Sequence, residues 1–114
     1  MKKIDRNIFD LKNKNIVING GLGLIGSEVV YALSKFNANL TVLDKKNNSN
    51  KKLNKLKNII FENYDTSNIV EIDKCFKKIL ESRKKIDVFI NCSYPFDSYW
   101  TNNTFDKINS NSLN

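Results

Sequence analysis

The sequence predicts an α/β fold, in which helices cover a parallel β-sheet. Short runs of apolar, mostly β-branched residues alternate with longer segments whose apolar residues recur at helical spacing. Strands that alternate with helices in this way indicate a parallel sheet with right-handed crossovers. All four glycines of the chain lie between Gly20 and Gly26, directly after the first apolar run and before the first helical segment.

Composition limits the domain organisation and the kinds of site. The 114 residues are 40% hydrophobic and 27% charged, as in a single globular domain, so we expect one domain over residues 1–114. The chain has no histidine, and Cys75 and Cys92 lack metal-ligand spacing, which excludes a zinc site or a catalytic histidine. No apolar run approaches the roughly 20 residues of a membrane span, and no signal peptide follows Met1. We therefore expect a cytoplasmic domain with reduced thiols and no membrane partner.

The formal net charge of +7 raises the alternative of a nucleic-acid binder. Lysine and asparagine are scattered along the whole chain, however, and the densest basic run, residues 45–57, contains no aromatic residue to stack on bases. We interpret the charge as a solvated surface and expect no nucleic-acid partner. A nucleic-acid binder would instead lose affinity steeply as the salt concentration rises.

Four apolar runs are expected to form the strands of the sheet. They occupy residues 15–19, 40–44, 59–61 and 86–91. The first and last are nearly unbroken in apolar residues, which is typical of strands buried on both faces. The first dozen residues are polar, and their apolar members are expected to pack loosely against the domain: Ile8, Phe9 and Leu11.

Two helices are expected between the strands, over residues 24–36 and 69–83, with Ser67 as the N-cap of the second. The apolar face of the first helix is predicted to comprise Ile25, Val29, Leu33 and Phe36. That of the second is predicted to comprise Ile69, Ile72, Phe76, Ile79 and Leu80. The polar segment 45–58 is expected to be a loop with one weak helical turn around Leu53 and Leu56.

The glycine-rich turn lies between a strand and a helix, which is the context that a dinucleotide-binding turn requires. Gly20 would let the chain turn off the strand, Gly21 or Gly23 would let the backbone approach a pyrophosphate, and Gly26 would let the helix pack close to the sheet. The helix N-terminus would add N–H groups and partial positive charge. The candidate cofactor-binding segment therefore comprises Gly20, Gly21, Leu22, Gly23, Leu24, Ile25 and Gly26. The alternative is a turn that binds no ligand and needs its glycines only for its backbone conformation.

Two acids follow later strands. Asp44 closes the second strand, 18 residues after Gly26, where the dinucleotide fold places an acid that binds the adenosine ribose hydroxyls. A carboxylate there would also repel the 2′-phosphate of NADP, so we expect NAD as the cofactor, although Lys45 and Lys46 offer opposite charge. The alternative for Asp44 is a solvated loop acid. Asp65 could accept from the adenine amino group or cap the helix that follows, and both interpretations stay open.

Four segments resemble the short-chain dehydrogenase/reductase family in their order and spacing: residues 19–26, 42–44, 64–66 and 86–95. The resemblance covers roughly residues 13–114. It implies a Rossmann fold with three layers and the strand order 3-2-1-4, an NAD(P) cofactor, and oxidation or reduction of an alcohol or carbonyl. It also implies that Asn91, Cys92 and Ser93, after the fourth strand, lie near the cofactor ribose.

The chain departs from the family motifs at several positions. Asn19 stands in place of the usual threonine, and Leu24 replaces the middle glycine, which Gly23 supplies one position earlier, as in the extended branch of epimerases and dehydratases. After Asn91, residues 92–94 differ from the usual Asn-Ala-Gly. The pair Tyr94-Pro95 resembles a subgroup of flagellin-modification oxidoreductases.

The family's catalytic segment is missing. Its members use a tyrosine with a lysine four residues later, together with a serine, and here only Tyr31 and Lys35 fit that spacing. Because this pair lies on the first helix, we interpret it as coincidental. We therefore expect no catalytic residue in this chain, no activity of the chain alone, and a fragment of a longer oxidoreductase acting on a small molecule such as a sugar or glycan precursor. The alternatives are a stand-alone nucleotide-binding or interaction module and an extended-type sugar-nucleotide epimerase or dehydratase fragment.

The implied strand order leaves the fourth strand at an edge of the sheet. Family members cover this strand with a fifth one. An unpaired edge that carries Val88, Phe89 and Ile90 predicts low solubility or self-association.

Overall fold

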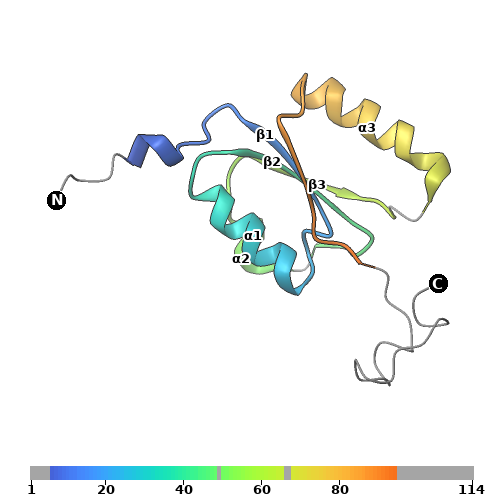
Figure 1. Cartoon of the computed structure of the whole chain (residues 1–114). Helices are drawn as coiled ribbons and strands as arrows, with labels where there is room; N and C mark the ends of the chain where they lie inside the picture. Colours follow the sequence, from blue (N-terminus) through green and yellow to red (C-terminus); the bar gives the residue numbers. More distant parts are fainter. Residues whose placement is uncertain (1–5, 49, 66–67, 95–114) are drawn as a thin grey trace, which may run out of the picture.

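The computed structural model describes residues 6–48, 50–65 and 68–94. In this part of the chain a four-stranded parallel sheet has the order β3-β2-β1-β4. Its strands are β1 (Asn15–Asn19), β2 (Asn39–Asp44), β3 (Ile59–Asn63) and β4 (Val88–Asn91). The helices α1 (Leu24–Ser34) and α2 (Lys51–Asn54) cover one face, and α3 (Ile69–Arg83) covers the other (Figure 1). The predicted three-layer fold and strand order are confirmed.

The alternation of side chains along β1 explains how the sheet holds two helical layers. Ile16 and Ile18 belong to the apolar cluster on the α1 and α2 side, whereas Val17 belongs to the cluster on the α3 side. Each of the three is at most 2% exposed. Because β1 is paired with β2 and β4 and covered on both faces, its sequence is apolar without interruption.

The predicted helix over residues 24–36 is present but ends at Ser34, and its predicted apolar face is correct in part, since Val29 and Leu33 pack against the core. Its buried residues are Gly26 and Val30, whereas Ile25 is 68% exposed and Phe36 is 42% exposed. Gly26 lacks a side chain and therefore lets the helix backbone approach the start of the turn. This close contact between Gly26 and Gly20, together with the burial of Val30 one turn later, sets the rotation of the helix about its axis. The longer side chains of Ile25 and Phe36 do not set it.

The helix α3 has the bounds that the sequence predicts, but two details differ. Its N-cap is Asn68, so the prediction of Ser67 is wrong; Ser67 itself lies outside the described residues. Of the predicted apolar face, Ile79 is buried and packs with Val17 and Leu43 of the sheet, while Ile69 is 80% exposed. Leu80 is exposed as well. The helix therefore contacts the sheet along a narrower stripe than its periodicity predicts.

The predicted helical turn in the basic loop is confirmed as α2. The side chain of Asn50 accepts hydrogen bonds from the backbone N–H groups of Lys52 and Leu53, at 3.0 and 3.2 Å, and so caps this short helix. Leu53 is 1% exposed and belongs to the cluster under α1. The N-terminal 3-10 helix η1 (Arg6–Phe9) is loosely attached, as expected, since Ile8 and Phe9 are exposed and Leu11 is partly buried.

The ends of the sheet opposite the glycine turn are tied together by side chains. Arg83, at the end of α3, donates to the carbonyl groups of Leu40 and Asn58 at 2.8 and 3.1 Å. The carboxylate of Asp87 accepts from the backbone N–H of Asn15 at 2.8 Å. These bonds fix the starts of all four strands. Within the described residues, no helix is both long enough and apolar enough to cross a membrane, and Cys75 and Cys92 are free thiols.

Candidate functional site

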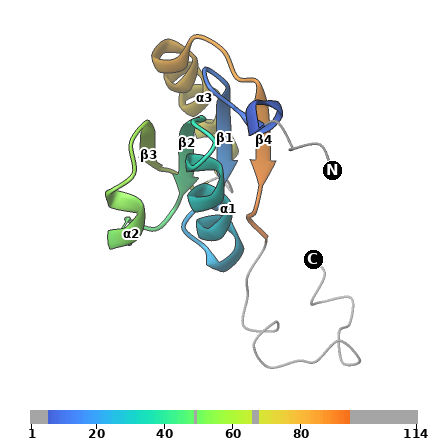
Figure 2. The same ribbon diagram turned by 90° about the vertical axis from the view of Figure 1, so that its left-hand side faces the viewer.

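The carboxyl ends of the strands form the edge of the sheet where the sequence predicts a ligand. All strands run in the same direction, and the glycine turn connects the end of β1 to the start of α1 at this edge (Figure 2). In open parallel sheets, ligands bind outside the carboxyl ends where the chain leaves neighbouring strands in opposite directions. Here β1 leads to α1 on one face, and β2 and β4 flank it.

Three of the four glycines are required by packing within the protein. Gly20 has a φ of +72°, and a Cβ there would lie 2.7 Å from the backbone nitrogen of Ser93. A Cβ on Gly26 would collide with the carbonyl oxygen of Gly20, and one on Gly21 with the side chain of Val42. The turn is thereby pressed against β2 and against the loop that follows β4.

Gly23 differs from the other three glycines. A Cβ built on it would meet a single neighbour, the carbonyl oxygen of Gly20, at the ordinary contact distance of 3.4 Å. Its backbone is extended, with φ −77° and ψ −178°, so other residues could adopt it. Of the two glycines that could admit a pyrophosphate, only Gly23 therefore has open space beside its backbone.

The N–H groups of the turn fall into two sets. Those of Gly20, Leu22 and Gly23 donate within the protein, to the carbonyl of Leu43, the carboxylate of Asp44 and the carbonyl of Gly20, at 2.7, 2.9 and 3.2 Å. The N–H groups of Leu24, Ile25 and Gly26 have no acceptor among the described residues, and the helical bonds of α1 begin at Ser27. Three donors at the positive end of a helix dipole are thus available to a ligand.

Asp44 ties the turn to the end of β2. Its carboxylate oxygens accept from the backbone N–H groups of Leu22, at 2.9 Å, and Lys46, at 3.0 Å. A carboxylate that accepts two such bonds has lone pairs left for a further donor. Asp44 is therefore more than a solvated loop acid, because it also fixes the path of the glycine turn, a role that the sequence did not indicate.

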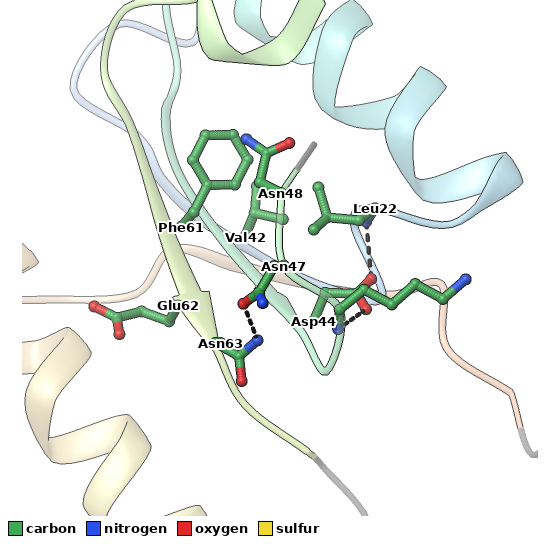
Figure 3. A pocket seen from close by; sticks show the side chains of 9 residues that line it. Leu22, Val42, Asp44, Asn47, Asn48, Phe61, Glu62 and Asn63 are labelled. Atoms are coloured by element: carbon green, nitrogen blue, oxygen red, sulfur yellow. Dashed lines mark hydrogen bonds between the residues drawn. The ribbon is translucent and has the colours of Figure 1, made fainter. Parts of the chain in front are cut away.

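A small pocket lies beside Asp44, between the glycine turn and β3 (Figure 3). Its volume is about 140 Å³, below the roughly 300 Å³ of pockets that enclose a whole small molecule. It can therefore hold one part of a ligand, such as a ribose or the edge of a base. It is lined by Leu22, Val42, Asp44, Lys46, Asn47, Asn48, Phe61, Glu62 and Asn63. The β3 residues of this pocket were not predicted from the sequence. Side chains two positions apart on a strand lie on the same face of the sheet, however, so Phe61 and Asn63 could have been placed together.

Comparison with known proteins assigns the chain to a family. The sequence model of the NAD dependent epimerase/dehydratase family matches residues 16–112. The chain belongs to this family. The predicted resemblance to short-chain dehydrogenases, and to their epimerase and dehydratase branch, is thereby confirmed.

Solved structures of dehydrogenases and epimerases share the fold. A short chain dehydrogenase from Leptospira borgpetersenii is 24% identical, with a TM-score of 0.74 over 99% of this chain and 42% of its own. The Cj0485 dehydrogenase is 22% identical, with a TM-score of 0.73 over 92% of this chain and 40% of its own. The epimerase Mth375 from Methanothermobacter thermautotrophicus is 24% identical, with a TM-score of 0.59 over 75% of this chain and 24% of its own. This chain thus spans about two fifths of the length of the first two.

Of the remaining candidate residues, those after β4 lie beside the turn. The side-chain oxygen of Asn91 accepts from the side chain of Asn19 at 3.0 Å and from the backbone N–H of Ser93 at 3.1 Å. Cys92 donates its N–H to the carbonyl of Asn19 at 2.8 Å. Asp65 is exposed and is not among the residues that line the pocket; its carbonyl accepts from the N–H of Asn68 at 3.0 Å.

The tyrosine and lysine that match the spacing of the family's catalytic pair have a packing contact. The ammonium groups of Lys35 and Lys52 lie 4.4 and 3.7 Å from the centroid of the Tyr31 ring. Both cations approach the ring itself, which is a cation–π arrangement that joins α1 to α2. Tyr31 packs against the apolar cluster on the α1 face, which supports the interpretation that the spacing is coincidental.

Proposed function

We propose that this chain binds NAD at the glycine turn. The observation that carries the proposal is the open space at Gly23 beside three N–H groups, those of Leu24, Ile25 and Gly26, for which the described part of the chain provides no acceptor. A pyrophosphate needs both a close approach to the backbone and donors at a helix N-terminus, so this chain's residues fit the cofactor. The Leptospira dehydrogenase was crystallised with bound NAD+, which supports the same assignment here.

Asp44 and the loop after β4 would hold the ribose groups. The Asp44 carboxylate lies at the rim of the pocket and would accept hydrogen bonds from the hydroxyls of the adenosine ribose. A 2′-phosphate would meet the negative charge of Asp44, so we propose NAD in preference to NADP. The backbone of residues 91–93 would border the second ribose, and Asp65 would contribute to the adenine end.

The reaction of the whole protein is proposed from the family. Bound NAD would accept a hydride from an alcohol carbon, as an oxidoreductase or as the first step of an epimerase or dehydratase. The substrate class we propose is a small alcohol or carbonyl compound such as a sugar. Since this sequence contains no further tyrosine with a lysine four residues later, we expect the chain alone to bind NAD without turnover. A single domain in the cytoplasm, without nucleic-acid or membrane partners, remains part of this proposal.

Titration calorimetry of the folded chain with NAD and with NADP tests the proposal. We expect saturable NAD binding and weaker NADP binding. A Gly23→Val variant should lose at least about tenfold in NAD affinity because its side chain would occupy the open space, while its melting temperature should change little, since the extended backbone suits a β-branched residue. Ala32→Val, on the exposed surface of α1, is the matched control and should bind normally.

Two results would contradict the proposal. One is a folded wild-type chain that binds no NAD. The other is a Gly23→Val variant that binds NAD as tightly as the wild type, which would place the cofactor elsewhere.

A further inference from the structure

The loop between β2 and α2 carries opposite charges at the rim of the pocket. Asp44 is followed directly by Lys45 and Lys46, and both Asp44 and Lys46 line the pocket. Neither lysine forms an ion pair with a residue that the structure describes. A carboxylate would repel a ribose 2′-phosphate, whereas an ammonium group would attract it. The preference between the two nucleotides therefore depends on which of these groups the loop presents to the ribose.

Asn63, at the end of β3, holds this loop in place. Its side-chain amide donates to the backbone carbonyl of Lys45 at 3.3 Å. It also donates to the side-chain oxygen of Asn47 at 2.9 Å (Figure 3). The N–H of Lys46 donates to Asp44 at 3.0 Å. The two interactions together fix the backbone on both sides of Lys46, and the side chains of both lysines are exposed.

The far end of the loop is fixed without Asn63. The side-chain amide of Asn48 donates to Asn54 at 2.7 Å, and its oxygen accepts from the N–H of Asn50 at 2.9 Å. Asn50 in turn caps α2. Loss of the Asn63 amide would therefore release residues 45–47 and leave α2 in place.

The position of Asn63 on β3 explains why this residue performs the task. Side chains alternate along a strand, so the side chains of Phe61 and Asn63 lie on one face of β3, and the carboxylate of Glu62, which also borders the pocket, is directed to α3 on the other. There the carboxylate of Glu62 forms an ion pair with Lys78 at 2.9 Å. Figure 3 shows Glu62 directed away from the loop and the Asn63 amide directed toward Asn47. Among the described residues that line the pocket, Asn63 is the one that connects β3 to the lysine-bearing loop.

We propose that Asn63 is a positioning residue that sets the nucleotide preference of this site by fixing the backbone of the loop that carries Lys45 and Lys46 beside Asp44. The proposal rests on the NAD binding proposed above. With Asn63 in place, the Asp44 carboxylate is fixed at the pocket by two backbone N–H groups and disfavours a 2′-phosphate, while the loop that carries the exposed lysines cannot turn toward that phosphate. Without the amide, the loop can turn and bring an ammonium group to the phosphate, so NADP gains relative to NAD.

The test compares the dissociation constants of NAD and NADP for the wild type and for Asn63→Ala. We expect the preference for NAD to fall by roughly five- to tenfold, the effect of one or two hydrogen bonds. A triple variant that also carries Lys45→Ala and Lys46→Ala should regain the wild-type preference. In Asn63→Ala alone, NADP binding should weaken more steeply with salt, because a new charge contact is screened.

Asn39→Ala is the matched control. Asn39 also donates a side-chain amide bond between neighbouring strands, to Asn15 at 3.3 Å, but at the opposite end of the sheet. We expect it to leave the preference unchanged. Asn63→Leu, which keeps the volume of the side chain and removes the donor, gives a second reading if Asn63→Ala folds poorly.

The outcomes separate the two proposals. NAD binding by the wild type with an unchanged preference in folded Asn63→Ala or Asn63→Leu overturns the role of Asn63 and leaves the proposed function intact. A changed nucleotide preference that persists in the triple variant, which lacks both lysines, also overturns the role of Asn63. Absence of NAD binding by the folded wild type overturns both proposals.

Discussion

The glycines of the turn have two different roles: some are required by packing within the protein, and one leaves open space beside the backbone. Gly20 and Gly26 are required because neighbouring backbone atoms occupy the space of a side chain, whereas Gly23 leaves that space open to the solvent. The sequence predicted the role of Gly26 but left the choice between Gly21 and Gly23 undecided. The choice depends on the Val42 side chain, which fills the space beside Gly21 and comes from a strand 21 residues later. Such contacts are not visible in local spacing.

Asp87 makes the stability of the fold depend on pH. The backbone N–H of Asn15 and the nearby Lys85 hold the pKa of the Asp87 carboxyl below its usual value. A group whose pKa is depressed in the folded state stabilises it above the unfolded pKa of about 3.9 and loses this contribution as the pH falls through the folded pKa. We therefore expect the free energy of unfolding to decrease on acidification below about pH 4.

Urea denaturation of the wild type and of Asp87→Asn between pH 7 and pH 3 checks this expectation. The variant should be less stable at pH 7, and the difference between the two proteins should shrink as the pH falls toward 3 and the wild-type carboxyl takes up a proton. Parallel curves over the whole range would show that Asp87 contributes nothing to the pH dependence.

At the scale of the elements, the strands were predictable, whereas the orientation of the helices was predicted only in part. Buried parallel strands are recognised by composition alone, because a run such as Ile16-Val17-Ile18 must be covered on both faces. The rotation of α1 depends instead on the close approach of Gly26 to Gly20, which leaves Ile25 exposed against the prediction. The hydrogen bonds of Asn63 were also missed, since they join residues 16 and 18 positions apart.

Arg83 connects α3 to the starts of the neighbouring strands, and its removal should weaken the whole sheet. An Arg83→Met variant keeps the apolar stem and loses the guanidinium, which leaves the carbonyl groups of Leu40 and Asn58 without this donor. We expect a loss of about 1–2 kcal/mol in the free energy of unfolding, as for a partly exposed hydrogen bond from a charged group.

Chemical denaturation measures the effect of Arg83. Lys77→Ala, on the exposed surface of α3, is the control and should change the free energy by less than about 0.5 kcal/mol. An Arg83→Met variant as stable as this control would mean that water replaces the guanidinium without cost.

At the scale of the whole molecule, the described part of the sheet ends at β4, which pairs with β1 alone. Val88 is 42% exposed and Phe89 is 49% exposed. An apolar edge strand with unpaired backbone groups favours contact with another chain. We therefore expect the chain to self-associate as its concentration rises.

Light scattering over a range of concentrations, with the wild type and with Phe89→Lys, tests this association. A lysine at an edge strand opposes pairing, so the variant should remain monomeric at concentrations where the wild type has begun to associate. An Ile69→Lys variant alters an apolar residue of α3 that is more exposed than Phe89 and lies outside the edge strand, and it should behave as the wild type does. Equal association of all three proteins would exclude β4 as the contact.

The hydrogen bond between Asp44 and the N–H of Leu22 limits how this site can change in evolution. The same carboxylate that would select the nucleotide also holds the glycine turn against β2. Replacing Asp44 to admit a 2′-phosphate would therefore release the turn that is proposed to bind the pyrophosphate, and the gain at one end of the ligand would be offset by a loss at the other. A lineage that changes its nucleotide should keep the acid and vary the loop and its anchor, so substitutions are expected to accumulate at positions 45–47 and 63 while position 44 stays constant.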